Sequence, residues 1–449
     1  MPDLIKVAKF GGTSMADANA MKRCASIVQS DPDKRVIVVS ATSGTTNLLT
    51  DIILEKSSDK RRDLVKIIRK RHLAICRDAN LKKDPVQQVE SILEELDEEV
   101  TGNKIMSPML MDRILAFGER LSSTIFAEIL RSESGQPVKG CDARTFMKTD
   151  SQHGNAEPDI EAIADMVDAE LRPAIRRSTV VTQGFIASDS DGNTTTLGRG
   201  GSDYSAALMA EALDADVLEI WTDVTAIYTT DPGIYPGARP ITEISFDEAA
   251  ELSVFGAKVL HPATMVPAIR KNIRVYVGSS IHPEKPGTWI VNEAREQPVI
   301  RAISIRRNQT LVKVHSLDML HRYGFLSKLF QVLAEHRISV DLVTTSEVSV
   351  ALTLDTNAGS SGNQKLSPEA IQELKTFSEV EIERGLSLVA LVGNNLNETA
   401  GLSGPVFGAL EDINIHLICH GASSHNLCFL VAEEEAEDVI RVLHKKFIS

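Results

Sequence analysis

The chain has 449 residues, of which 43% are hydrophobic, and it carries 48 lysine and arginine residues against 62 aspartate and glutamate residues. This composition is that of a globular protein and excludes a wholly disordered or fibrous chain. At roughly 100–200 residues per domain, the length predicts two to four domains. The net charge of −14 repels phosphate backbones and anionic lipid, so neither nucleic acid nor a membrane surface is expected as a partner.

The five cysteines are odd in number and widely spaced: Cys24, Cys76, Cys141, Cys419 and Cys428. They form no CxxC pair of the kind that a metal or redox site usually needs. We therefore expect reduced thiols in a cytoplasmic protein and no metal site made by the protein alone. The N-terminal segment reaches a lysine before a signal-like apolar stretch can form, and the longest run without charged residues, 413–432, holds three histidines. Neither segment predicts a targeting signal or a membrane span.

From the N-terminus to about residue 294, short β-rich runs alternate with longer helical patterns. Strands are predicted at Leu4–Phe10, Val36–Ser40, Val138–Ala143, Thr179–Ile186, Val217–Thr222 and Arg274–Gly278. Helices are predicted at Asp112–Arg131, Asp159–Leu171, Ser202–Leu213 and Phe246–Phe255. This alternation predicts an α/β domain with a mostly parallel sheet, in which ligands bind at the carboxyl ends of the strands.

An internal repeat follows a proline-rich stretch after Ile281, and we place a domain boundary near residue 294. Leu311–Val314 matches Leu388–Leu391 at an offset of 77 residues, and Ser349–Leu354 matches Asn426–Val431 at the same offset. Matching segments at a fixed offset predict a duplicated βαββ unit.

The first repeat, about 311–385, continues with helix and strand patterns that complete a ferredoxin-like βαββαβ unit. The second repeat, about 386–449, ends in a helical pattern and lacks a fourth strand. A strand-like segment at 299–305 precedes the first repeat, and we expect it to cross over and complete the second. The two repeats would then be locked together.

The sequence KFGGTS, Lys9–Ser14, follows the first predicted strand and precedes a helical pattern. Its two glycines leave backbone N–H groups able to bind an anion, and a lysine can reach a phosphate as a point charge. A tight structural turn explains the same residues equally well, and the pattern is not a Walker A loop.

The sequence TTTLGRGGSD, 194–203, is more specific. Three glycines surround Arg199, and Ser202 is expected to cap a helix whose first turn contains Asp203. Backbone N–H groups at a helix start, together with a guanidinium fork, make a site for a carboxylate or a phosphate. A dinucleotide-binding GxGxxG would need a glycine at position 203, which argues against a dehydrogenase.

Other segments place polar residues at predicted strand ends or on predicted helices. SATSGTTN, 40–47, ends the second strand in hydroxyl groups, and Glu119 lies in the helical pattern FGERLS. WTDVTAIYTTDP, 221–232, contains Asp223 and Tyr228, which could frame a nucleotide base and ribose. Taken singly, SATSGTTN is typical of a loop, Glu119 of a solvated helix acid and WTDVTAIYTTDP of a packed turn. Lys258 in FGAKVLHP is typical of a surface lysine.

Together and in this order, KFGGTS, SATSGTTN, TLGRGGSDYSA, WTDVTAIYTTDP and FGAKVLHPAT resemble the motifs of the aspartate kinases of the amino-acid kinase family. The C-terminal part resembles their tandem ACT regulatory domains, in particular those of the lysine-sensitive single-function form. The resemblance implies a three-layer kinase fold over 1–294, two intertwined ACT domains over 295–449, and a homodimer or homotetramer formed through the ACT domains. Because the chain ends with the second repeat, no fused homoserine dehydrogenase is expected.

The resemblance also implies roles for single residues. A triphosphate cradle is implied at Lys9, Gly11 and Gly12, with Asp203 orienting the lysine. Contacts to aspartate are implied for Thr46, Glu119, Arg199, Gly200, Gly201 and Ser202. The nucleotide site would add Thr222, Asp223, Tyr228 and Lys258, with ATP bound as its magnesium complex. Lysine-sensitive members often carry a basic residue where this chain has Gly233, so one nucleotide contact would differ.

The residue types suit transfer of the ATP γ-phosphate to the side-chain carboxylate of L-aspartate. That carboxylate has a reference pKa of about 3.9, so it is already ionised at neutral pH and needs no general base. The barrier is the approach of an anion to the triphosphate, which lysines, glycine N–H groups and Mg²⁺ would lower. Arg199 suits the α-carboxylate of the substrate and Glu119 its ammonium group. The product would be 4-phospho-L-aspartate, the first intermediate toward lysine, threonine and methionine.

ACT units commonly bind small amino acids at the turn after the first strand and along the second strand. In the first repeat these places hold Met319, Gly324, Phe325, Leu326, Ser339, Val340, Asp341, Ser346 and Glu347. In the second repeat His416 replaces Asp341 and Ser424 replaces Glu347, so only the first repeat offers two carboxylates. Two acids suit an effector with two ammonium groups, and we expect feedback inhibition by lysine at this unit.

Two alternatives stay open. Another amino-acid kinase could act on a related acidic substrate such as a glutamate derivative. A non-catalytic amino-acid sensor would need none of the phosphate-binding residues. Formation of aspartyl hydroxamate from ATP, Mg²⁺, aspartate and hydroxylamine separates these possibilities.

Overall fold

The computed structural model describes residues 4–101, 105–256, 260, 262–320, 323–355 and 366–448. By its contacts the chain forms two compact units. Unit 1 comprises Met1–Ile227, Pro240–Phe246 and Val259–Ala294; unit 2 comprises Tyr228–Arg239, Asp247–Lys258 and Arg295–Ser449. Two short segments that precede residue 294 in the sequence therefore belong to unit 2.

Unit 1 is built around an eight-stranded sheet in the order β3-β4-β2-β1-β7-β9-β10-β8. Its strands are β1 (Lys6–Phe10), β2 (Lys34–Val39), β3 (Val138–Gly140), β4 (Thr179–Gln183), β7 (Val217–Thr222), β8 (Glu243–Ser245), β9 (Arg274–Ser279) and β10 (Thr288–Val291). Its neighbours pair in parallel except β9 and β10, so the mostly parallel sheet predicted from the sequence is confirmed. A separate hairpin joins β5 (Ile186–Ser188) to β6 (Thr194–Thr196).

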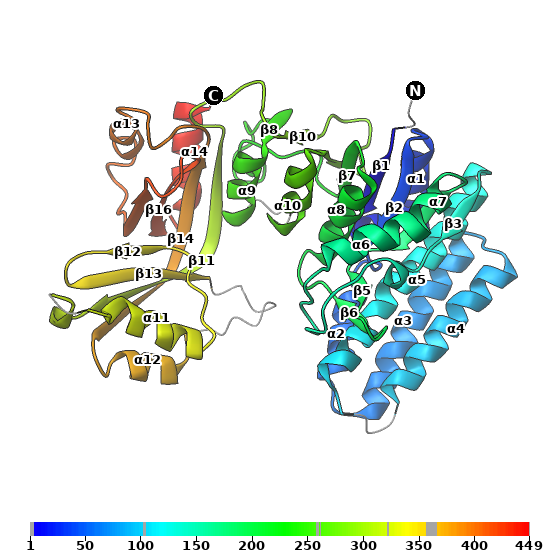
Figure 1. Cartoon of the computed structure of the whole chain (residues 1–449). Coiled ribbons are helices and arrows are strands. Elements are labelled where there is room, and N and C mark those ends of the chain that lie inside the picture. The colour runs from blue at the N-terminus through cyan, green and yellow to red at the C-terminus, as the bar shows by residue number, and fades with distance from the viewer. Residues whose placement is uncertain are drawn as a thin grey trace. The chain divides into compact units, whose positions relative to one another are not determined.

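Two groups of helices pack on this sheet (Figure 1). The helices of unit 1 are α1 (Ala18–Gln29), α2 (Thr45–Leu54), α3 (Ser58–Asp78), α4 (Lys83–Val100), α5 (Pro108–Ser134), α6 (Ile160–Met166), α7 (Arg172–Ile175), α8 (Gly201–Leu213) and α10 (Pro262–Lys271). Short turns of other helix types are η1 (Thr13–Met15), η2 (Ala143–Thr145) and η3 (Val167–Leu171). In one group α5 contacts β2, β3 and β4, and in the other α8 contacts β1, β2 and β7.

The long helix α5 has clear start and stop signals. The hydroxyl of Ser107 accepts a hydrogen bond from the backbone N–H of Leu110 at 3.2 Å, and Pro108 occupies the first turn. At the other end Gly135 adopts a φ of 62°, the left-handed cap that favours glycine. These signals fix the placement of a helix that carries one of the predicted site residues.

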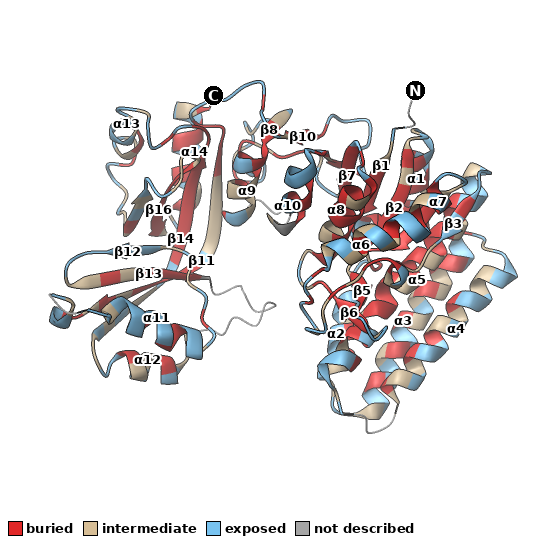
Figure 2. Cartoon of the chain, in the orientation of Figure 1, coloured by how far each residue is buried: buried red, intermediate tan, exposed pale blue. Residues whose placement is uncertain are grey.

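The core of unit 1 follows the central strands, which Figure 2 shows as buried. Helices cover both faces of the sheet, and β2 accordingly contains a continuous apolar run, Val36–Val39, that is fully buried. At the end of β1, Phe10 stacks on Trp221 of β7 with ring centroids 6.2 Å apart.

One predicted strand is shorter than expected. The run Thr179–Ile186 divides into β4 and β5, because Phe185 adopts a φ of 67° and turns the chain out of the sheet. That conformation is costly for a bulky residue, and the backbone N–H of Phe185 is held by the hydroxyl of Ser205 at 2.9 Å. Phe185 follows the carboxyl end of β4, where parallel sheets bind their ligands.

Unit 2 contains a six-stranded antiparallel sheet in the order β12-β13-β11-β14-β16-β15. Its strands are β11 (Ala302–His315), β12 (Val343–Thr345), β13 (Ser349–Asp355), β14 (Glu379–Val392), β15 (Leu417–His420) and β16 (Asn426–Ala432). Its helices are α9 (Phe246–Val254), α11 (Phe325–Glu335), α12 (Pro368–Leu374), α13 (Ser403–Phe407) and α14 (Ala436–Phe447), with a 3₁₀ turn η4 (Leu317–Met319).

Two long strands serve both halves of this sheet. β11 and β14 pair along their length, from Ala302 opposite Val392 to His315 opposite Glu379. The segment 302–305 therefore lies beside 389–392, while the C-terminal part of β11 pairs with β13 of the first half. Each half has its own hydrophobic cluster, one under α11 and α12 and the other under α14. We call them the first and second halves of unit 2.

No helix in the part of the chain that the structure describes is both long enough and apolar enough to cross a bilayer.

A buried ion pair fastens α9 to the rest of unit 2, and it yields a stability prediction. Nε of Arg301 lies 2.7 Å from a carboxylate oxygen of Glu248, which also accepts the Asn394 amide at 2.8 Å, and Glu248 is fully buried. Arg301→Met would leave this carboxylate buried without its guanidinium. We expect the free energy of unfolding to fall by about 3–5 kcal/mol in urea titrations.

The matched control is Lys66→Met, which removes an exposed lysine 2.8 Å from Asp63. A change of at most about 1 kcal/mol is expected there. If both substitutions lowered the free energy of unfolding by the same small amount, the stabilising role of the buried Arg301–Glu248 pair would be contradicted.

Candidate active site

The carboxyl ends of four neighbouring strands are joined by backbone hydrogen bonds. The N–H of Gly11 donates to the carbonyl of Trp221 at 3.2 Å, that of Ser40 to Phe10 at 3.1 Å, and that of Gly184 to Val39 at 3.0 Å. The loops after β1, β2, β4 and β7 are therefore held at one edge of the sheet, as predicted for a ligand site.

Lys9 lies near the end of β1, and its side chain reaches the first turn of α8. Its ammonium Nζ is 2.5 Å from a carboxylate oxygen of Asp203, and both side chains are mostly buried. At this depth the attraction is screened far less than at the surface. The ion pair holds a cation in a fixed place at the sheet edge.

The chain after Lys9 is drawn toward β7 and β9. Ser14 is buried, and its hydroxyl lies 2.7 Å from that of Ser280, whose own hydroxyl donates to the carbonyl of Thr222 at 3.1 Å. The hydroxyl of Thr222 donates in turn to Asp223 at 3.1 Å, and Asp223 is exposed. The structure thus brings the glycine pair Gly11 and Gly12 to the same sheet edge as Thr222 and Asp223.

Glu119 reaches the same edge because α5 comes close to the loop after β2. A Cβ on Gly118 would lie 2.8 Å from Cβ of Ala41, so only glycine permits this approach. The backbone N–H of Ala41 donates to one carboxylate oxygen of Glu119 at 3.1 Å. Burial raises the pKa of Glu119 to about 8, against the smaller opposing effects of the Ala41 hydrogen bond and the Lys9 charge.

The loop 197–200 joins β6 to α8 through two glycines with positive φ, Gly198 at 72° and Gly200 at 74°. The helix begins at Gly201, with Gly200 as its N-cap and no side-chain cap. The expected cap by Ser202 is therefore wrong, because Ser202 lies within the first turn. A Cβ on Gly184 would come within 2.7 Å of Cα of Ser202, so the strand end and this turn are in close contact. Arg199 is exposed at the centre of the loop.

Thr46 differs from its buried neighbour Thr45. Thr46 is exposed in the first turn of α2, whereas the Thr45 hydroxyl lies 2.6 Å from that of Thr42. His72 of α3, fully buried, lies 3.1 Å from the Thr42 hydroxyl and donates from Nδ1 to the carbonyl of Ile68 at 2.8 Å. Burial lowers the pKa of His72 to about 4, so its ring is neutral and orders the loop after β2.

Sequence reasoning missed Asp112, which anchors the glycine-rich loop. Its carboxylate is fully buried in α5 and accepts from the Thr196 hydroxyl at 2.6 Å, from the Gly154 N–H, and from His153 at 2.9 Å. Thr196 ends the strand that leads into Gly198. An acid inside a helical pattern carries no local sign of this role.

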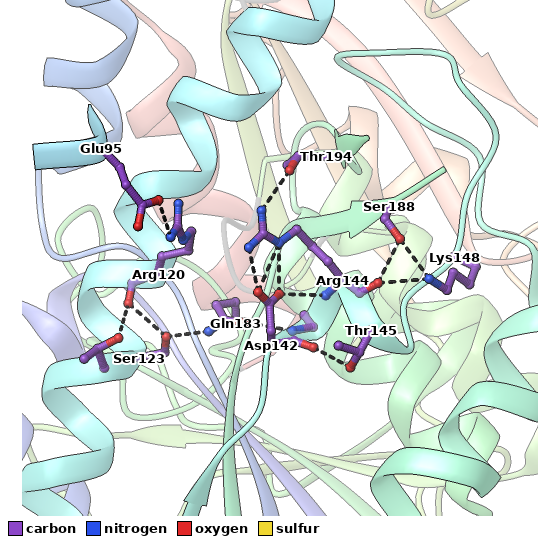
Figure 3. A network of polar contacts seen from close by, with 12 residues as sticks. Glu95, Arg120, Ser123, Asp142, Arg144, Thr145, Lys148, Gln183, Ser188 and Thr194 are labelled. Carbon is purple, nitrogen blue, oxygen red and sulfur yellow. Dashed lines mark hydrogen bonds and ion pairs between the residues drawn. The ribbon is translucent and has the colours of Figure 1, made fainter. Parts of the chain in front are cut away.

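A second polar network supports α5 and the hairpin, as Figure 3 shows. Gln183 at the end of β4 donates to Ser123 of α5 at 2.7 Å and accepts from the backbone of Ala143 at 2.8 Å. The guanidinium of Arg144 donates hydrogen bonds to the carboxylate of Asp142 and to the Thr194 hydroxyl, the latter at 3.0 Å. These contacts hold the elements that carry Glu119 and the glycine-rich loop.

A cavity of about 450 Å³ lies beside this network, between α4, α5 and β3. Its arginines Arg120 and Arg131 are already matched by Glu95 and Glu128. Because these charges are paired within the protein, we assign no ligand to the cavity.

Tyr228 and Lys258 are the other residues predicted for the nucleotide site. Tyr228 is half-buried at the start of a segment of unit 2. Lys258 falls outside the described residues. Among the residues that are described, no cluster of three or more histidine, cysteine or acidic side chains could hold a metal ion by itself.

The predicted effector residues gather in the first half of unit 2. Met319 lies in η4, Gly324 is the N-cap of α11 with a φ of 86°, and Phe325 and Leu326 begin that helix. Ser339, Val340 and Asp341 precede β12, and Ser346 and Glu347 follow it in the turn to β13. The carboxylate of Asp341 pairs with the guanidinium of Arg306 on β11, and Glu347 is exposed.

The comparisons with known proteins cover the whole chain. The profile of the amino acid kinase family matches residues 5–279, and that of an ACT domain matches 389–447. The lysine-sensitive aspartokinase 3 of Escherichia coli is 49% identical over 442 residues, which are 98% of this chain and 98% of that protein.

The chain belongs to the aspartokinases. Two crystal structures of Escherichia coli aspartokinase III match it with 48% identity over 99% of this chain and 100% of theirs. One, in complex with aspartate and ADP in the R-state, has a TM-score of 0.88; the other, with lysine and aspartate in the T-state, has a TM-score of 0.87. The fold class expected from the sequence, an amino-acid kinase fold followed by ACT domains, is confirmed for this aspartokinase.

The raised pKa of Glu119 gives a prediction for the unliganded protein. The folded state keeps this proton up to about pH 8, whereas an unfolded glutamate releases it near 4.5. The resulting stabilisation is present below pH 4.5 and is lost as the pH rises toward 8. In urea titrations from pH 5 to pH 8, the wild-type protein should lose stability relative to Glu119→Gln. Parallel pH curves for the two proteins would contradict the assignment.

Proposed function

We propose that this aspartokinase transfers the γ-phosphate of ATP to the side-chain carboxylate of L-aspartate and is inhibited by L-lysine. The product would be 4-phospho-L-aspartate, the first intermediate toward lysine, threonine and methionine. The observation that carries the proposal is the Lys9–Asp203 ion pair at the carboxyl edge of a parallel sheet. It occurs in a chain 49% identical to a lysine-sensitive aspartokinase over its whole length.

Phosphoryl transfer between these anions needs charge stabilisation more than proton transfer. The attacking carboxylate is ionised at neutral pH, since its reference pKa is about 3.9. Lys9, fixed by Asp203, supplies a cation for the transferring phosphate, and the N–H group of Gly12, the N-cap of η1, adds a dipole. The N–H of Gly11 already donates to the Trp221 carbonyl, so Gly11 would contribute by letting the backbone approach the phosphate closely. We assign Lys9 and Asp203 to the catalytic machinery, and Lys258 as a second cation at the nucleotide.

Aspartate would be held by charged groups on two elements. Arg199 offers a planar fork to the α-carboxylate, and Gly200 and Ser202 offer N–H groups at the start of α8. The N–H of Gly201 donates to the Gly198 carbonyl at 3.1 Å, so Gly201 would shape the turn that faces the substrate. Glu119 would receive the substrate ammonium, whose charge compensates the burial that raises the pKa of this acid. Thr46 would contribute a contact from the first turn of α2.

The nucleotide would bind over Gly11 and Gly12, with Thr222, Asp223 and Tyr228 near the base and ribose. Mg²⁺ binds mainly to phosphate oxygens and water, with one or two carboxylates. We therefore expect the metal to arrive as part of the ATP complex.

We keep the functional division at 294 and 295. Residues 1–294 would be catalytic and residues 295–449 regulatory, with a first ACT domain of about 311–385 and a second of about 386–449 plus 299–305. The pairing of 302–305 with 389–392 supports this assignment of the crossing segment.

Lysine would bind in the first half of unit 2. Its two ammonium groups match the two carboxylates of Asp341 and Glu347, and they would compete with Arg306 for Asp341. In the second half, His416 stands in place of Asp341 and lies 2.7 Å from Glu383. Position 416 therefore supplies no carboxylate of its own, and the neighbouring Glu383 is already in contact with His416 and Lys313.

Assembly as a homodimer or homotetramer through the ACT domains fits the surface of the first half. Large apolar side chains are exposed on it: Leu317, Leu320, Tyr323, Leu326, Phe330 and Val343. Such a set is typical of a protein interface.

The activity is tested with ATP, Mg²⁺, aspartate and hydroxylamine, with aspartyl hydroxamate as the readout. Wild-type protein should give the hydroxamate, and glutamate in place of aspartate should not. Lys9→Ala should lower turnover by about 10²–10³ with the fold intact by circular dichroism, because a stabiliser of transition-state charge is lost. Near-wild-type turnover would remove Lys9 from the site, and no product from the wild type would favour a non-catalytic sensor.

Lysine inhibition is tested in the same assay with Asp341→Ala and Glu347→Ala. Both variants should keep aspartokinase activity, and the lysine concentration for half inhibition should rise at least about tenfold, since each loses a charged partner of the effector. Glu398→Ala, an exposed acid in the second half, is the control and should leave the curve unchanged. Full lysine sensitivity in both acid variants, or inhibition by threonine alone, would contradict the assignment.

A further inference from the structure

The segment 228–239 of unit 2 begins with Tyr228, a proposed nucleotide residue, and packs on the second half of the six-stranded sheet. The backbone N–H of Thr229 donates to the carbonyl of Arg239 at 2.9 Å, which closes the segment into a loop. The carbonyl of Thr229 accepts from the N–H of Ile303 on β11 at 2.8 Å. We call residues 228–239 the clamp loop.

The C-terminal helix α14 contacts this loop through a buried histidine. His444 is fully buried, and its Nε2 lies 2.8 Å from the hydroxyl of Thr229. That hydroxyl also accepts from the backbone N–H of Arg239 at 2.9 Å, so its own hydrogen can be donated to the imidazole. Burial and the nearby Arg239 charge lower the pKa of His444, which keeps the ring neutral and able to accept.

Further contacts of α14 fix the rest of the clamp loop. The His444 ring packs on Tyr235 with centroids 4.6 Å apart. Nε of Arg441 donates to the carbonyl of Ile234 at 3.2 Å, and the side chain of Ile234 is part of the hydrophobic cluster under α14. The guanidinium of Arg239 reaches the carbonyl of Ile448 just beyond the helix.

Packing alone does not require a polar pair at this place. The buried face of α14 is otherwise apolar, with Val439, Ile440 and Leu443 in the same cluster, and a leucine at 444 would bury more apolar surface. A hydrogen bond between buried groups is directional, so it selects one position of the loop. The residue immediately before Thr229 is Tyr228, the proposed nucleotide contact.

We propose that His444 is a positioning residue for the nucleotide: through Thr229 it sets the backbone that presents Tyr228. The inference rests on the proposed nucleotide site, and it assigns to the helix of the second half a role in ATP binding. The second half thereby supports catalysis as well as the regulatory sheet.

The test measures ADP binding with Mg²⁺ by calorimetry on the full chain, so that no turnover is needed. Thr229→Val and His444→Leu each remove the hydrogen bond and keep the side-chain volume nearly constant. The dissociation constant for ADP should rise about two- to tenfold in each, the effect of one net hydrogen bond. Thr229→Ser keeps the hydroxyl and should bind ADP as the wild type does. Thr229→Val also removes the acceptor of the Arg239 backbone N–H, so the double variant should match Thr229→Val, which has already lost the bond to His444.

A control on the same helix distinguishes a role of His444 in ADP binding from a purely structural role. Ile440→Val removes one buried methylene and should lower the melting temperature without changing ADP affinity. In the hydroxamate assay the KM for ATP should rise in Thr229→Val while the KM for aspartate stays within about twofold.

Unchanged ADP affinity in both Thr229→Val and His444→Leu would overturn the proposal. So would weakening of ADP and aspartate in parallel, in proportion to the loss of melting temperature that Ile440→Val shows. A wild-type protein that binds ADP but makes no hydroxamate would refute the proposed function and leave this inference standing. A wild-type protein that binds no ADP would refute both.

Discussion

The ion pair between Lys9 and Asp203 sets the geometry on which the proposed site depends. It joins the end of β1 to the first turn of α8, so the strand and the helix cannot move apart without exposing a buried charge. Backbone hydrogen bonds between adjacent strand ends hold the other loops at the same edge of the parallel sheet. A cation held in this way needs little reorganisation when a phosphate arrives, which is the condition for electrostatic catalysis.

Around this ion pair, buried polar side chains hold the loops that carry the charged residues of the proposed site. Asp112 holds the strand before Gly198, His72 orders the loop after β2, and Gln183 joins α5 to the end of β4. Each of them bonds to a hydroxyl group or to the backbone, and none carries a role that the reaction itself demands. Their contribution is to keep loops rigid whose own sequences are rich in glycine and threonine.

The sequence predicted the parallel sheet and the duplicated sheet well, because hydrophobic periodicity and a fixed repeat offset can both be recognised along the chain without knowledge of contacts. Strand ends were less predictable: the end of β4 depends on the left-handed conformation of Phe185, which its residue type disfavours. The predicted capping of α8 by Ser202 was also wrong, since the N-cap is Gly200, which has no side chain. The roles that the resemblance implies for the single site residues stay predictions.

The supporting residues of the site could not be found from the sequence for a physical reason. Asp112 and Thr196 are 84 positions apart, and Thr229 and His444 are 215 apart, so only folding brings them together. An isolated acid or histidine in a helical pattern reads as solvated until its burial is known. The assignment of segment 228–239 to unit 2 likewise depends on contacts that follow no linear boundary.

The sharing of β11 and β14 has a consequence for the order in which unit 2 is synthesised and folds. The first half contains β11, β12 and β13, but β11 lacks its second neighbour until β14 has been translated. Pairing of such distant segments carries a loop-closure cost and is slow. During synthesis, β11 would present an open edge while some sixty residues of chain emerge, a period in which unpaired strand edges are prone to association. The nascent chain is therefore most exposed to misassembly before β14 leaves the ribosome.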